Sequence, residues 1–166
     1  MSNQSTDEVV WSTSDFSIAA YLHSLGVRLV NVTFRQGGQR QDAVFHFDDR
    51  SGRCPEMAIR FLNSDAFSYD QGQRALKKLV FGWAGQEEAG ERGTWSTTDF
   101  PLASYVLSSG AEFVGFRRIH RSRREYEFYF KDGDGSCEEL SVAFVNSAAH
   151  RFDQSQRALK KLVFGR

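Results

Sequence analysis

The chain has 166 residues, of which 40% are hydrophobic, and its 21 Lys and Arg balance its 21 Asp and Glu. This length and apolar content allow a buried core and exclude a disordered chain, while zero net charge excludes a uniformly basic surface for nucleic acid or membrane. No apolar run reaches the length of a membrane span, and the polar, acidic residues 1–10 lack the layout of a signal peptide. We therefore expect a cytoplasmic protein whose residues 1–10 are disordered.

The two halves of the sequence are similar to each other. Ten letters, QRALKKLVFG, occur at residues 73–82 and again at residues 156–165, and most of the remaining sequence aligns between the halves as well. Self-similarity over this length predicts a repeat architecture. We expect two homologous units, residues 11–82 and 95–166, joined by a Gly- and Glu-rich linker at residues 83–94.

The first predicted element of each unit is a helix. It begins at a residue type that caps helices, and two neighbouring candidates exist in each copy: Ser14 or Asp15, and Thr98 or Asp99. The helix ends before a glycine, Gly26 or Gly110, which is a typical stop signal. Apolar residues at helical spacing between these signals predict that one face of each helix is buried.

A β-hairpin is predicted next in each unit. Phe45 and Phe47 alternate with polar residues, as do Phe128 and Phe130, which is typical of a strand with one apolar face. The predicted strands cover residues 27–34 and 42–49 in the first unit and residues 112–119 and 124–132 in the second.

Two further helices complete each unit. The last one is predicted to begin at Asp70 or Asp153, because Asp-x-x-Gln at each position is similar to a capping box. The apolar letters of the repeated phrase fall at helical spacing and predict a buried stripe of Ala75, Leu76, Leu79 and Val80, with Ala158, Leu159, Leu162 and Val163 in the second copy.

These elements predict an α+β fold of two tandem units, each built as helix, β-hairpin, helix, helix. A unit of this size is marginally stable alone, so the two units are expected to pack about a pseudo-twofold axis. Joining the two hairpins into one antiparallel sheet would remove two exposed edges.

Three stretches carry a resemblance to a known family. STTDFPLASYVLSSG, AFVNSAAHRFD and the final QRALKKL resemble short domains of unknown function found in bacteria and phages, in which a Thr-Thr-Asp-Phe helix start and a terminal Leu-Lys helix recur. The resemblance covers nearly all of each repeat. It implies a fold and a prokaryotic or viral setting, and it implies no activity.

Catalytic and metal chemistry find little support in the sequence. Cys54 and Cys137 precede helices at equivalent positions, but neither belongs to a Cys-x-x-Cys pair, and the four histidines do not match between the repeats. Two of the repeated carboxylate pairs stand at predicted helix starts, where capping explains them. We expect no catalytic residue, no metal site and no cofactor, and hence a protein that is not an enzyme.

Basic residues with aromatic neighbours give the strongest functional signal. They occupy the second hairpin and both copies of the repeated phrase, where they lie off the apolar stripe. Such a surface is typical of proteins that bind single-stranded or structured DNA or RNA, and the alternative is a protein partner that uses the same residues as hot spots, as an accessory or inhibitor subunit would. The candidate residues are Arg117, Arg118, Arg121, Arg123, Arg124, Tyr126, Arg74, Lys77, Lys78, Arg157, Lys160 and Lys161.

Overall fold

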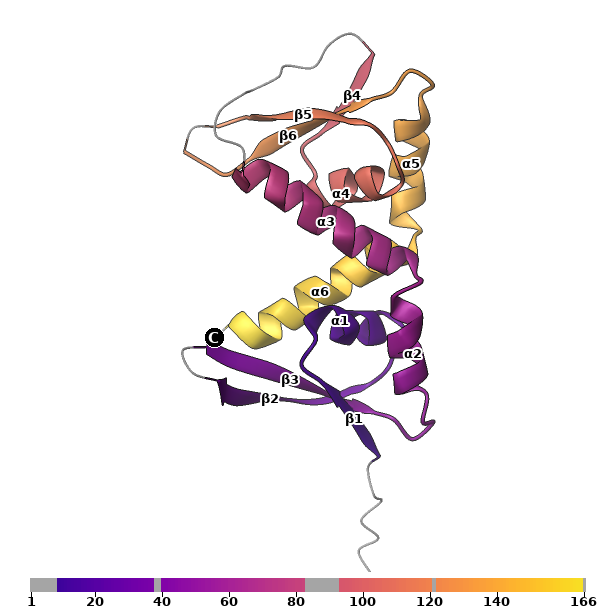
Figure 1. The fold of residues 1–166 in the computed structure, drawn as a ribbon, viewed down its shortest axis with the longest axis vertical. Helices are drawn as coiled ribbons and strands as arrows, with labels where there is room; N and C mark the ends of the chain where they lie inside the picture. Colours follow the sequence, from indigo (N-terminus) through magenta and orange to yellow (C-terminus); the bar gives the residue numbers. More distant parts are fainter. Residues whose placement is uncertain (1–8, 38–39, 83–92, 121, 166) are drawn as a thin grey trace, which may run out of the picture. The chain divides into compact units, whose positions relative to one another are not determined.

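The computed structural model of the chain describes residues 9–37, 40–82, 93–120 and 122–165. Over these ranges the fold is α+β, as predicted, with six helices and two three-stranded antiparallel sheets (Figure 1). Residues 1–8 of the expected disordered segment and residues 83–92 of the expected linker lie outside the described ranges.

Both halves of the sequence use one order of elements, which is strand, helix, hairpin, helix and helix. In the first half these are β1 (Val10–Thr13), α1 (Phe16–Ser24), β2 (Leu29–Gly37), β3 (Arg40–Asp48), α2 (Cys54–Phe61) and α3 (Asp65–Gly82). In the second half they are β4 (Thr94–Thr97), α4 (Phe100–Ser108), β5 (Phe113–Arg118), β6 (Tyr126–Lys131), α5 (Ser136–Val145) and α6 (Ala148–Phe164).

The two predicted hairpins form, but they do not join into one sheet. The strand orders are β1-β3-β2 and β4-β6-β5, so each hairpin gains a third strand from the residues just before its own first helix. Trp11 pairs with Phe47 on β3, and Trp95 pairs with Phe130 on β6. The expectation of a joined sheet was wrong: over the described residues each hairpin pairs only with the short strand of its own half, and the strands form two separate sheets.

The predicted signals around the first helix are confirmed. The Asp15 carboxylate accepts hydrogen bonds from the backbone N–H groups of Ser17 (2.8 Å) and Ile18 (3.0 Å), which satisfies donors at the start of α1. Asp99 caps α4 in the same way, so aspartate is the N-cap in both copies. After the helices, Gly26 and Gly110 have φ of +80° and +92°, a conformation that glycine adopts without strain.

The compact units of the structure differ from the sequence repeats in one element. Unit 1 comprises residues 1–64 and 151–166, and unit 2 comprises residues 65–150. Unit 1 therefore contains most of α6, which comes from the second half of the sequence. Unit 2 contains α3, which comes from the first half. In each unit the helices lie over one face of the sheet (Figure 1).

Aromatic contacts record this helix allocation in both cores. In unit 1, Phe61 of α2 stacks on Phe152 of α6 with ring centroids 5.7 Å apart. In unit 2, Phe144 of α5 stacks on Tyr69 of α3 at 6.0 Å. These four residues hold equivalent positions of the repeat, so each stack joins one residue from each half of the sequence.

The buried stripe of the last helices is narrower than predicted. Leu76, Val80 and Leu159 are buried, and Leu76 and Val80 belong to a core cluster of unit 2 with Phe128 and Phe130. Ala75 and Ala158, however, are exposed, and Leu162 is 54% exposed. The prediction failed for these three residues because the face of each long helix that packs against its unit is narrower than the apolar stripe in the sequence.

The starts of the last helices were also predicted wrongly. The structure begins α3 at Asp65 and α6 at Ala148, and Ser147 accepts a hydrogen bond from the His150 N–H at the first turn of α6. Asp70 and Asp153 lie inside the helices and are buried. They therefore do not form capping boxes.

No helix within the described ranges combines the length and apolar character that crossing a membrane requires.

Candidate functional site

Arg117 belongs to a polar cluster on the sheet of unit 2. Its Nη2 lies 2.7 Å from Oε2 of Glu127 on the paired strand, and Ser96 donates a hydrogen bond of 2.9 Å to the other oxygen of the same carboxylate. The Tyr129 hydroxyl also donates to Glu127. Hydrogen bonds from Tyr129, Ser96 and Arg117 hold the pKa of Glu127 below its ordinary value. The charge of Arg117 is thus offset within the protein.

Further predicted arginines lie at the turn end of the same hairpin. Arg118 donates from Nε to the backbone oxygen of Arg123 at 3.3 Å. Arg123 Nη1 in turn lies 3.8 Å from a carboxylate oxygen of Glu125. Arg121 lies outside the described residues. The arginine-rich hairpin is therefore interspersed with carboxylates, which weakens it as a continuous basic ribbon.

The arginines of the repeated phrase have a structural role. Arg74 Nε lies 2.9 Å from Asp70 Oδ2, and Arg157 Nε lies 2.7 Å from Asp153 Oδ2, in each case one helical turn apart. Only 7% and 9% of the two aspartate side chains is exposed. A buried carboxylate needs a charged or hydrogen-bonding neighbour, so the fold accounts for the identity of these arginines, which the sequence analysis proposed for nucleic-acid binding.

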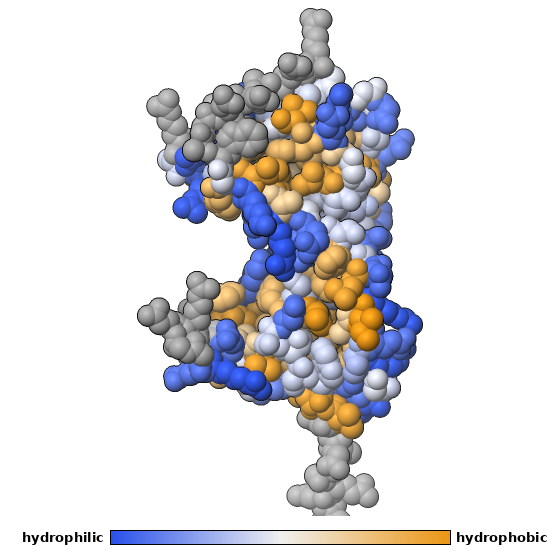
Figure 2. All heavy atoms as spheres, viewed as in Figure 1, coloured by the Kyte–Doolittle hydropathy of each residue, from blue (hydrophilic) through white to orange (hydrophobic). Residues whose placement is uncertain are grey.

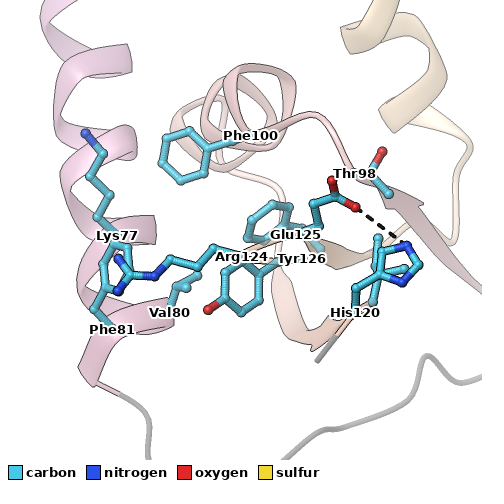
Figure 3. Close-up of a pocket in the computed structure, with 11 residues that line it drawn as sticks. Lys77, Val80, Phe81, Thr98, Phe100, His120, Arg124, Glu125 and Tyr126 are labelled. Carbon is cyan, nitrogen blue, oxygen red and sulfur yellow. Dashed lines mark ion pairs between the residues drawn. The ribbon is translucent and has the colours of Figure 1, made fainter. Parts of the chain in front are cut away.

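Lys77, Arg124 and Tyr126 come together at one pocket of unit 2 (Figure 3). The pocket has a volume of about 630 Å³ and lies between the C-terminal part of α3, the start of α4 and the turn end of the hairpin. Its apolar lining includes Phe81, Phe100 and Phe128, with Val80 and Ile119; Thr98, His120 and Glu125 complete it.

Both cations of this pocket lie over aromatic rings. Lys77 Nζ is 5.8 Å from the centroid of the Phe100 ring, and Arg124 Cζ is 5.9 Å from that of Phe81. Contacts of this kind hold a cation by the negative face of the ring. On the opposite side, His120 Nε2 lies 3.7 Å from Glu125 Oε2 (Figure 3). The pocket thus combines aromatic walls, two cations and one carboxylate.

The remaining predicted lysines divide into two kinds. Lys160 lines a pocket of unit 1 beside Phe16, with Nζ 5.8 Å from the ring centroid. Lys78 and Lys161 are exposed and do not line either of these pockets. The sequence treats the two lysines of each phrase alike, whereas the structure distinguishes them.

The candidate residues from the sequence include Tyr126 but not Phe81, another aromatic residue of the pocket. Phe81 is the ninth letter of the repeated phrase and was passed over as an apolar residue next to the buried stripe. It is 65% exposed, and its ring faces Arg124. The signal that could have identified it is position: Phe81 follows Val80 directly, which places it beside the buried face and not on it.

The repeated cysteines lie in surroundings that suppress thiol chemistry. Burial, reinforced by Asp49, raises the pKa of the Cys54 thiol to about 11, and burial with Asp132 does the same for Cys137. Each aspartate also accepts a hydrogen bond of 3.0 Å from the cysteine's own backbone N–H at the helix start. Both cysteines are free thiols. Among the described residues, no cluster of three or more His, Cys, Asp or Glu is placed to hold a metal ion.

Comparisons with protein-family models, with curated proteins and with solved structures find no match for this chain.

Proposed function

We propose that this protein is a non-enzymatic nucleic-acid-binding protein that holds a single strand at the pocket of unit 2. One observation carries the proposal: Lys77 from the repeated phrase and Arg124 and Tyr126 from the hairpin line the same aromatic pocket. These residues are far apart in the sequence, and each was a candidate for nucleic-acid binding on composition alone.

The chemistry of the pocket suits a nucleotide. A nucleobase has two π-faces that stack on aromatic side chains, and its phosphate is an anion that lysine and arginine bind. The rings of Phe81 and Tyr126 stand beside the Lys77 and Arg124 cations within a pocket of about 630 Å³. Binding pockets for small ligands typically have volumes of about 300–1,000 Å³.

The charges around the pocket favour a few local contacts over a broad basic track. Arg117 and Arg123 face glutamates, and apolar and hydrophilic surfaces are interspersed on the face shown in Figure 2. For a single strand bound through about two phosphates, the logarithm of the binding constant falls with the logarithm of the salt concentration with a slope of about −1.4. We expect a slope in this range, much shallower than that of a strongly basic protein.

The test is fluorescence anisotropy with labelled single-stranded DNA, single-stranded RNA and duplex, titrated at several salt concentrations. Lys77→Glu and Arg124→Glu are each expected to weaken single-strand binding about tenfold or more and to reduce the salt slope by about 0.7, the contribution of one phosphate contact. Tyr126→Ala is expected to weaken it roughly 5- to 150-fold through lost stacking.

The chain offers a matched control for charge. Lys78→Glu makes the same charge change on the residue next to Lys77, and Lys78 does not line the pocket. It is expected to cost threefold or less, because only long-range electrostatics is lost. An equal loss in the control would show diffuse attraction in place of a pocket, and no binding at low salt would end the nucleic-acid proposal.

A protein partner is the second candidate, and exposed apolar residues at the C-terminal ends of α2 and α5 favour it. Ile59 and Leu62 are 67% and 58% exposed, and the equivalent Val142 and Val145 are 65% and 63% exposed. Exposed apolar groups that recur together are typical of interaction sites. Ile59→Asp is expected to leave nucleic-acid binding unchanged, because Ile59 does not line the pocket. A loss of nucleic-acid binding with Ile59→Asp would contradict the separation of the two surfaces.

A further inference from the structure

Unit 1 has a pocket of its own at the place equivalent to the pocket of unit 2. It has a volume of about 470 Å³ and lies between the start of α1, the strand β3 and the C-terminal part of α6. Its walls include the rings of Phe16, Phe45 and Phe164, with Lys160 and Asp42 as charged groups.

The two pockets correspond residue by residue. Every residue that lines the unit 1 pocket aligns, in the sequence repeat, with a residue that lines the unit 2 pocket. The lysine, the three phenylalanines and the valine are identical, and the carboxylate and the hydroxyl are kept as Asp42 for Glu125 and Ser14 for Thr98. The lysine lies 5.8 Å from the phenylalanine centroid in both units.

Core packing accounts for the buried members of this set, Phe45, Phe128 and Val80, but not for the exposed ones. Phe164 is 76% exposed and Phe81 is 65% exposed, and both pocket lysines are exposed. An exposed phenylalanine gains little from the hydrophobic effect. Phe81 and Phe164 each line the wall of a pocket. Each pocket combines a helix from one half of the sequence with a sheet from the other half.

We infer that the unit 1 pocket is a second nucleotide-binding site for the same class of ligand, a single-stranded nucleic acid, with the base against the phenylalanines and a phosphate at Lys160. This inference rests on the function proposed for unit 2. The unit 1 site is the weaker of the two, because Ala43 stands where unit 2 has Tyr126, and none of the residues whose side chains the structure describes adds an arginine to the pocket. The missing stacking partner makes the affinity roughly 5- to 150-fold lower.

The experiment is a titration of the full-length, ¹⁵N-labelled protein with a deoxythymidine trinucleotide, followed by amide chemical shifts. A trinucleotide keeps the two sites independent, and amide shifts report each pocket separately. The amides of Phe16, Ala43 and Lys160 are expected to move along one weak binding curve, and those of Phe100 and Tyr126 along a tighter curve.

Two variants test whether the weak binding curve comes from the unit 1 pocket. Lys160→Glu is expected to abolish the unit 1 curve while the unit 2 affinity stays within twofold. Lys161→Glu, the matched control on the adjacent residue, is expected to retain both curves, since Lys161 does not line the pocket.

The outcomes separate the two proposals. If the unit 2 amides shift and the unit 1 amides do not, the second site is wrong and the proposed function stands. If neither set shifts, the proposed function fails and the second site fails with it. If Lys77→Glu removes the unit 1 shifts together with the unit 2 shifts, the unit 1 changes are indirect, and the second site is again overturned.

Discussion

Gly72 of α3 packs directly against the backbone of Ser104 in α4, so closely that a β-carbon on Gly72 would lie 2.6 Å from the Ser104 carbonyl oxygen. Real side chains essentially never approach a backbone oxygen this closely, and backbone cannot move aside without shifting the helix. The close crossing of these two helices therefore depends on a glycine in the middle of α3.

Replacing this glycine is expected to destabilise unit 2. Gly72→Ala favours the helix by about 1 kcal/mol but forces α3 away from α4, and such overpacking typically costs about 1–3 kcal/mol. We expect a net loss of stability, measured as a lower midpoint in urea unfolding. Gly82→Ala is the control, because a β-carbon there meets nothing within 4 Å. A Gly72→Ala protein as stable as the control would contradict the close crossing.

The ion pair between Arg157 and Asp153 is expected to contribute more to stability than a surface ion pair. Arg157→Ala leaves the buried Asp153 carboxylate without its arginine, which we expect to cost about 1–3 kcal/mol in urea unfolding. Arg60→Ala is the matched control, since Arg60 and Glu56 form the same one-turn pair with both side chains more than half exposed. The control is expected to change stability by about 0.5 kcal/mol or less. Similar losses in both variants would show that burial of Asp153 is unimportant.

The Glu127 cluster is expected to make the fold sensitive to acid. Because the pKa of Glu127 is lower in the folded protein than in the unfolded chain, folding favours the ionised carboxylate. This contribution is present above the ordinary pKa of 4.5 and is lost as the pH falls through the lower folded value. Glu127→Gln is expected to lower stability at pH 7 and to flatten the acid side of a stability–pH curve. Glu112→Gln, at an exposed ion pair with Lys131, is the comparison.

The two cysteines are expected to react slowly with thiol reagents. A pKa of about 11 leaves few thiolates at pH 8, and both side chains are buried, so 5,5′-dithiobis(2-nitrobenzoic acid) should label them only as fast as the fold opens. Because the pKa of each thiol is higher in the folded protein than in the unfolded chain, folding favours the protonated thiol. This contribution to the free energy of unfolding is lost as the pH rises from about 9 through 11. Rapid labelling of native protein would contradict this, and labelling in urea is the control.

Local signals predicted much of the fold because each acts within a few residues. Asp15 caps a helix, Gly26 ends it, and Phe45 and Phe47 alternate on a strand, all as expected. β1 and β4 escaped prediction because four residues are too few to show a period. The allocation of the last helices could not be predicted, since QRALKKLVFG is identical in both and its buried face fits either sheet.

The sequence could predict which cationic residues belong to the candidate site, but not which residues they contact. Lys77, Arg124 and Tyr126 stand out by residue type. That Arg117 faces Glu127 depends on strand pairing, in which the two residues lie opposite each other. The sequence predicts Asp70 as a helix cap, and that prediction does not lead to its contact with Arg74. Composition identifies charges, but their pairing depends on register and burial.

The allocation of α3 and α6 has a consequence for any attempt to divide the chain. A cut among residues 83–92 separates the sequence repeats. Each fragment then carries the last helix that belongs to the compact unit of the other fragment. The helices are not interchangeable in every detail: where α3 has Gly72, α6 has Ser155, whose hydroxyl lies 2.9 Å from Nδ1 of His23 in α1. Co-expressed fragments are therefore expected to assemble as a complementing pair, each recovering from its counterpart the helix it lacks.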